Sequence, residues 1–129
     1  MNMASVPTFT ATIYCGLAEG YGGKVHHISE AKTICREYCD KTGLGVTVIP
    51  LDFIYQMGGE IGIAVGLINY PRFPKKPEDV KYYALALAEL LKTALGQIRV
   101  SVVCSDETIT MEEFLDCHIR NDTSMGMDK

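Results

Sequence analysis

Four side chains that commonly bind ligands follow one another closely after an apolar stretch, at Asn69, Tyr70, Arg72 and Phe73. One proline separates the two pairs and another follows them, and each fixes its own φ and favours extended backbone before it. An amide can bind the edge of a base or ribose, a guanidinium suits phosphate, and aromatic rings stack on purines. The group predicts a surface for a small anionic nucleotide. The alternative is a plain strand exit, with the rings capping the core and the arginine in solvent.

Other candidate ligand-binding side chains lie further away in the chain. Arg99 begins an expected strand, and Tyr14 and Phe53 supply aromatic rings. We expect Arg72 and Arg99 to meet at one edge of the sheet as an anion clamp, within one subunit or across a subunit boundary. Lys24 ends a glycine-rich loop over residues 16–25 that matches neither phosphate-loop pattern, so the loop is either a simple mobile loop or a lid that carries this lysine.

Metal and nucleophile chemistry is less well supported. Cys35 and Cys39 are four residues apart on an expected helix and could join a histidine at Zn²⁺, but both fall on its apolar stripe. Cys15 and Cys104 could pair with a histidine for catalysis, but both lie in expected strands, where a buried thiol is the simpler interpretation. The sequence therefore predicts no catalytic residue, no metal and no cofactor.

The elements that would position these side chains alternate between strands and helices. Apolar alternation, β-branched residues and turn signals predict the strands, and 3.6-residue spacing predicts the helices. Their order is β-α-β-β-α-β, which predicts a ferredoxin-like α+β sandwich with an antiparallel sheet and two helices on one face. The expected strands cover 8–16, 45–55, 60–68, 97–104 and 108–111, and the expected helices cover 29–41, 77–94 and, as a short addition, 112–118.

Single residues suggest where several elements begin and end. Ser29 is expected to be the N-cap of the first helix, and Gly43 its C-terminal stop. Pro50 marks the second strand as an edge strand or a bulged one. Pro77 suits the first turn of the second helix, which should end at Gly96. That helix is apolar almost all round, so it should be buried on more than one side, and we expect at least a dimer.

Length, charge and cysteine content limit the class of protein. The 129 residues suffice for one domain with a core over about 8–118 and flexible tails. A net charge of −4 argues against a general DNA or RNA binder. The chain has five cysteines without a CxxC pair and no apolar run approaching the ~20 residues of a membrane span. These features predict a cytoplasmic protein with free thiols and no membrane partner.

Four stretches of the chain resemble the Thoeris anti-defence protein 1 family. They are residues 13–17, 53–60, 65–74 and 97–103, and the similarity covers residues 8–111. The resemblance implies a phage or prophage protein in the bacterial cytoplasm that sequesters a cyclic ADP-ribose isomer, or a cyclic trinucleotide, without cleaving it. It also implies dimers that assemble into hexamers. The aromatic, asparagine and arginine ligands of that family are matched in type by Asn69, Arg72, Phe73 and Arg99.

Two other functions stay open at this point. One is a small enzyme of the same fold, a phosphodiesterase or lyase, that uses a histidine such as His26 or His27. The other is an oligomeric adaptor without a small ligand, whose apolar second helix binds a protein partner.

Overall fold

Two helices and five strands make up the part of the chain that the structure describes. The structure is a computed structural model, and it describes residues 1–20 and 23–112. In chain order the elements are β1 (Thr10–Gly16), α1 (Ile28–Thr42), β2 (Thr47–Tyr55), β3 (Gly58–Ile68), α2 (Pro77–Ala94), β4 (Arg99–Cys104) and β5 (Thr108–Glu112). The predicted α+β class and ferredoxin-like order are confirmed, with β5 added at one edge.

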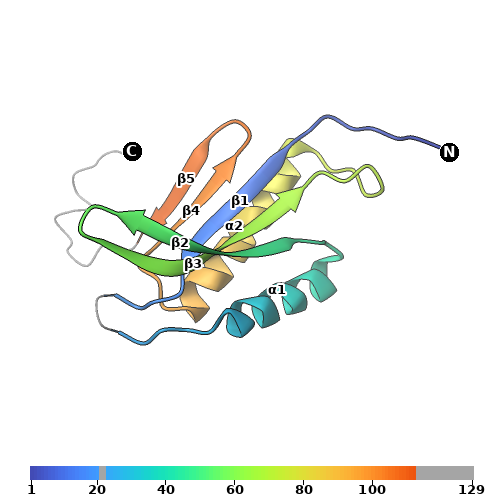
Figure 1. Ribbon diagram of the computed structural model, residues 1–129. Helices are drawn as coiled ribbons and strands as arrows, with labels where there is room; N and C mark the ends of the chain where they lie inside the picture. Colours follow the sequence, from blue (N-terminus) through green and yellow to red (C-terminus); the bar gives the residue numbers. More distant parts are fainter. Residues whose placement is uncertain (21–22, 113–129) are drawn as a thin grey trace, which may run out of the picture.

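The strands form one antiparallel sheet in the order β2-β3-β1-β4-β5 (Figure 1). The first strand pairs with β3 from Thr10↔Ile68 to Gly16↔Gly62, and with β4 from Ala11↔Cys104 to Tyr14↔Ser101. The strand β2 lies at an edge, as Pro50 predicted, because a proline cannot donate a ladder hydrogen bond in a central strand.

Both helices cover the same face of the sheet, and the core lies between them and the strands (Figure 1). The alternation of β1 places Ala11, Ile13 and Cys15 on this face, where all three are buried. The helix α2 packs on β1, β4 and β3 and also contacts α1. The second burial partner expected for α2 is therefore present in part within the chain itself.

The first helix begins earlier than expected, with its N-cap two residues before the predicted one. Its N-cap is His27 rather than Ser29, and the Nδ1 atom of His27 accepts a hydrogen bond from the backbone N–H of Ser29 at 3.1 Å. Glu30 accepts a hydrogen bond from the backbone N–H of His27 and completes a capping box. The expected stops are confirmed at Gly43, with φ 78°, and at Gly96, with φ 62°.

The helix expected over residues 112–118 is contradicted at its first residue, which belongs to a strand. Glu112 ends β5 and pairs with Arg99 across the β4–β5 ladder, so the carboxylate is held by a strand partner and not by a helix dipole. The remaining residues of that expected helix lie outside the described part of the chain.

The face of the sheet without helices carries exposed apolar side chains. These are Tyr14 on β1, Ile49 on β2, Ile68 on β3 and Val103 on β4. The predicted dimer or hexamer stays a prediction. Neither α1 nor α2, the helices within the described residues, is long and apolar enough to cross a membrane.

Candidate functional site

A cavity of about 590 Å³ lies between the start of α1 and the β2–β3 hairpin. Small-molecule sites typically have volumes of about 300–1,000 Å³, so this cavity is large enough for a nucleoside. It is lined by Leu17, Val25, His26, His27, Ile28, Pro50, Leu51, Asp52, Ile61 and Gly62. The walls are mainly apolar, and they come from four segments that are separated in the sequence.

The wall nearest β1 is the segment that joins β1 to α1. The backbone carbonyl of Leu17 accepts a hydrogen bond from the backbone N–H of His26 at 2.8 Å. The backbone carbonyl of Lys24 accepts one from the backbone N–H of Glu19, also at 2.8 Å. Ala18 and Val25 form an isolated antiparallel bridge. The two arms of the glycine-rich loop are therefore paired near the cavity and form a fixed wall there.

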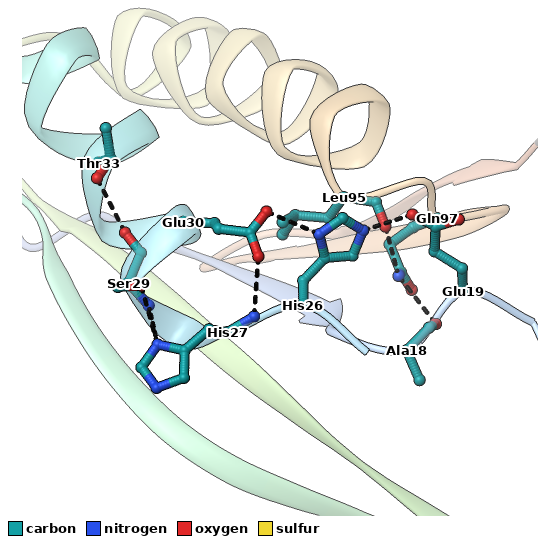
Figure 2. A network of polar contacts seen from close by, with 9 residues as sticks. All are labelled: Ala18, Glu19, His26, His27, Ser29, Glu30, Thr33, Leu95 and Gln97. Carbon is teal, nitrogen blue, oxygen red and sulfur yellow. Dashed lines mark hydrogen bonds and ion pairs between the residues drawn. The ribbon is translucent and has the colours of Figure 1, made fainter. Parts of the chain in front are cut away.

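The ring of His26 ties this loop to α1. Its Nε2 atom lies 2.5 Å from a carboxylate oxygen of Glu19, and its Nδ1 atom lies 2.9 Å from one of Glu30 (Figure 2). The side chain of His26 is only 5% exposed. A neutral imidazole has one N–H and can donate to only one ionised carboxylate, so the two contacts with ionised carboxylates favour the doubly protonated ring.

The positive charge on His26 is consistent with the upward shift of its pKa. Hydrogen bonds from the ring to Glu30 and then to Glu19 raise the pKa of His26 above its ordinary value, while burial acts against them. The same contact with His26 lowers the pKa of Glu30, with help from the backbone N–H of His27 and the nearby charge of Lys24. One imidazolium thus holds the loop against the first turn of α1.

A second anchor holds the same loop from the other side. The side-chain amide of Gln97 donates hydrogen bonds to the backbone carbonyls of Ala18 and Leu95, both at 3.0 Å (Figure 2). Gly96 lies against the side chain of Glu19, so a larger residue there would push this carboxylate away from His26. The turn after α2 therefore supports the wall of the cavity.

His26→Asn is expected to remove a pH dependence from the stability of the protein. Because the folded-state pKa of His26 is raised, its stabilisation is complete below the ordinary value of 6.5 and is lost as the pH rises through the raised value. The lowered pKa of Glu30 has the opposite consequence, since its contribution is present above 4.5 and is lost as the pH falls through the lowered value.

Thermal unfolding from about pH 5.5 to about pH 9 measures this dependence. The midpoint temperature of unfolding of the wild-type protein should fall toward the alkaline end of this range. That of His26→Asn should be lower than the wild-type value at the acidic end and should change less with pH. Superimposable profiles would show that His26 does not hold the loop as an imidazolium.

Asp52 is the acidic side chain of the cavity. It lies on β2 with the same parity as Val48, which packs against the core, so it is on the face of the sheet that carries the helices. It is exposed, and its cross-strand neighbour is Ile61. Within residues 1–20 and 23–112, no side chain forms a hydrogen bond or ion pair with its carboxylate.

The predicted site after β3 has a different arrangement from the expected one. Asn69 is buried, its amide donates to the carbonyl of Pro7 at 3.1 Å, and its oxygen accepts from the backbone N–H of Lys75 at 2.8 Å. Both functional ends of the amide are therefore engaged in holding the chain together.

Tyr70 and Phe73 do lie together, on the wall of a second cavity of about 40 Å³. This volume holds a few water molecules but no nucleotide. The guanidinium of Arg72 lies 5.6 Å from the centre of the Phe73 ring, in a cation–π contact. The aromatic pair and the arginine are thus clustered, but within this chain they enclose no site of nucleotide size.

Arg72 and Arg99 lie at opposite ends of the sheet, so the expectation that they meet is wrong within one subunit, and a meeting across a subunit boundary stays a prediction. Strands β3 and β4 are both antiparallel to β1, so they run parallel to each other (Figure 1). Arg72 follows the end of β3, beside the start of β1, while Arg99 begins β4, beside the end of β1. Arg99 also donates to Glu112 at 2.8 Å.

The other three predicted residues are dispersed. Tyr14 is partly exposed on the helix-free face of β1, and Lys24 is exposed on the loop before His26. Phe53 lies on β2, and its ring contacts Gly62, which lines the larger cavity. None of the predicted site residues lines that cavity: Lys24 precedes a lining residue in the chain, and Phe53 points to the face of β2 opposite to Asp52.

The described cysteines are poor nucleophiles. Burial raises the pKa of Cys15 to about 12 and that of Cys35 to about 11. Cys104 is also buried, and Cys39 is half-buried. A thiol reacts as the thiolate, so these side chains act as small apolar groups at neutral pH.

Neither Asp52 nor Glu19 was singled out from the sequence, and His26 was considered as a catalytic histidine or a metal ligand but not as an anchor of the loop. The i,i+4 spacing of His26 and Glu30 at a helix start was a readable signal for their contact. Glu19 and Asp52 come from segments that only the folded chain brings near α1. No local motif pointed to them.

Comparisons with known proteins give matches among solved structures alone. No family model matches the chain, and no curated protein matches it. A phage SAM lyase in complex with S-methyl-5'-thioadenosine has a TM-score of 0.70 and 17% identity, over 88% of this chain and 95% of that one. A phage SAM lyase in the apo state has a TM-score of 0.66 and 17% identity, over 81% and 89%.

These matches show a shared fold, and they change two expectations. Both neighbours are named as an enzyme, which contradicts the prediction that a chain of this kind has no catalytic activity. The resemblance to the Thoeris anti-defence family is not confirmed, because the matched structures are lyases of phage origin. The likeness is one of fold, and one of the two neighbours is in complex with S-methyl-5'-thioadenosine.

Proposed function

We propose that this protein is a lyase that cleaves S-adenosylmethionine, or a closely related adenosyl sulfonium, in the cavity between α1 and the β2–β3 hairpin. The observation that carries the proposal is the likeness in fold to a phage SAM lyase, which extends over 95% of that chain and includes a complex with S-methyl-5'-thioadenosine. The cavity of this chain has the volume and the apolar walls that such a ligand requires.

The apolar walls suit the adenosine part of the ligand. Leu17, Ile28 and Ile61 provide surface against which a purine and a thioether can be buried. The imidazolium of His26, with its two carboxylates, fixes one wall before the ligand arrives. A wall that is already ordered lowers the entropy cost of binding.

The reaction needs few proton transfers to or from the protein. The bond between the sulfonium sulfur and the four-carbon amino acid part breaks, and its electron pair stays on sulfur. The sulfur leaves as the neutral thioether S-methyl-5'-thioadenosine. The carbon that leaves sulfur needs a new electron pair. It obtains one either when a neighbouring carbon loses a proton to a base and a double bond forms, or when the carboxylate of the same fragment attacks it and closes a lactone. Positioning and exclusion of water are then the main contributions of the site.

Turnover of S-adenosylmethionine tests the proposal. The protein should release many equivalents of S-methyl-5'-thioadenosine, measured by liquid chromatography and mass spectrometry. Val25→Trp places a large ring at the wall of the cavity and should reduce the rate at least about tenfold, which is the effect of ~1.4 kcal/mol on the barrier. Leu90→Trp, on the exposed side of α2, is the matched control and should keep the wild-type rate.

Sequestration of a cyclic nucleotide is the alternative outcome of the same assay. A cyclic ADP-ribose isomer or cyclic trinucleotide that is withdrawn from solution and returned intact on heating, with S-adenosylmethionine unaltered, would contradict the lyase. Within one subunit, the arginines proposed for the pyrophosphate lie at opposite ends of the sheet, so a clamp formed by both would need a second subunit.

A further inference from the structure

The charges around the larger cavity are unevenly balanced. Its walls are apolar apart from a glycine, two histidines and Asp52. The imidazolium of His26 contacts the carboxylates of Glu19 and Glu30, neither of which lines the cavity, and the Nδ1 atom of His27 is used to cap α1. Among the described residues, neither a lysine nor an arginine lines the cavity. The carboxylate of Asp52 is therefore the formal charge that a ligand meets without a compensating partner.

The start of α1 does not reverse this balance. A helix N-terminus attracts anions through its free N–H groups and its dipole. Here His27 already caps the helix, and Glu30 places a negative charge in its first turn. Both features reduce the attraction for an added anion, so the cavity as a whole favours a cation over a phosphate.

We infer that Asp52 is a specificity-determining residue that makes this cavity prefer the cationic sulfonium substrate over its neutral thioether product. The inference rests on the proposed function. The sulfonium and the amino group of S-adenosylmethionine are both positive, whereas S-methyl-5'-thioadenosine is uncharged, so Coulomb attraction to a carboxylate acts on the substrate alone. Such a preference also helps the product to leave and disfavours anionic cyclic nucleotides.

Two ligands of nearly equal size separate charge from shape. Sinefungin carries a protonated amine where the sulfonium stands, and S-adenosylhomocysteine has a neutral sulfur there. Neither can release the thioether by sulfonium cleavage, so their dissociation constants can be measured at equilibrium by calorimetry, together with that of S-methyl-5'-thioadenosine. The wild-type protein should bind sinefungin more tightly than S-adenosylhomocysteine, and added salt should reduce the difference.

Asp52→Asn keeps the shape of the side chain and removes its charge. It should raise the dissociation constant of sinefungin about tenfold, in line with the loss of one charge contact. The dissociation constant of the neutral thioether S-methyl-5'-thioadenosine should change by no more than about twofold. Asp40→Asn, on an exposed residue of the last turn of α1, makes the same change in net charge away from the cavity and should alter neither.

Three results would overturn the assignment of Asp52. They are equal losses for charged and neutral ligands in Asp52→Asn, an equal effect of Asp40→Asn, and a wild-type protein that binds all the adenosyl ligands without preference. The last result would leave the proposed function in place. A wild-type protein that binds none of these ligands would instead overturn the proposed function and the role of Asp52 together.

Discussion

Replacing Leu91 by alanine is expected to lower the free energy of unfolding by about 2–5 kcal/mol, the usual range for a leucine deleted from a core. Leu91 is 0% exposed, and its helix packs on β1, β3 and β4. Small domains have about 5–15 kcal/mol in total, so this one substitution should remove a large part of the stability.

Leu90→Ala is the matched control for Leu91→Ala. Leu90 is the preceding residue on the same helix but is 47% exposed, so the same chemical change removes far less buried surface. Chemical denaturation of both variants measures the difference in free energy. Similar losses at the two positions would mean that α2 does not pack on the sheet through the Leu91 side.

Gly62→Ala is expected to cost about 1–3 kcal/mol or more, because the new methyl group has no room. A Cβ at Gly62 would lie 2.7 Å from the backbone carbonyl oxygen of Cys15 and would also collide with the ring of Phe53. The ring could turn, but the carbonyl belongs to the β1–β3 ladder and is fixed. Gly62 also lines the larger cavity, so a shift there should weaken ligand binding as well.

Gly45→Ala provides the comparison for Gly62→Ala. Nothing lies within 4 Å of a Cβ at Gly45, so alanine there should be neutral or stabilise the protein by a few tenths of a kcal/mol, up to about 1, through the unfolded state. Thermal unfolding of the two variants gives the contrast. A Gly62→Ala protein as stable as Gly45→Ala would contradict the close approach of the Phe53 ring and the Cys15 carbonyl to Gly62.

Local signals in the sequence were sufficient for most of the fold. Pro77 and Gly96 mark the ends of α2, Gly43 marks the end of α1, and Pro50 marks an edge strand, and the structure agrees at each. These residues constrain their own backbone, so their effect does not depend on distant contacts.

The start of α1 shows where local signals compete. Serine is a common N-cap residue, but the structure uses His27, whose ring accepts a hydrogen bond from the backbone N–H of Ser29, as the side-chain oxygen of an N-cap residue usually does from the N2 position. Glu30 decides between them, because it accepts a hydrogen bond from the N–H of His27 while its other carboxylate oxygen binds His26. The choice of cap therefore depends on a contact with the loop before the helix.

The site could not be derived in the same way. Its walls come from the loop after β1, the start of α1, β2 and β3. None of these stretches contains a sequence motif that indicates which other stretches it will meet in the folded chain. The error of placing Arg72 and Arg99 together within one subunit has a simpler cause, since two strands that are each antiparallel to β1 must run parallel to each other. Attention to strand direction would have placed the two arginines at opposite ends of the sheet.

Nuclear magnetic resonance of the ¹⁵N-labelled protein, titrated with S-methyl-5'-thioadenosine, tests most directly that the larger cavity is an adenosyl site. The predicted result is a set of saturable amide shifts centred on Leu17, His27, Leu51, Asp52 and Ile61. Shifts centred instead on Tyr70, Phe73 and Lys75 would place the ligand at the smaller cavity, and a spectrum that does not change would contradict adenosyl binding.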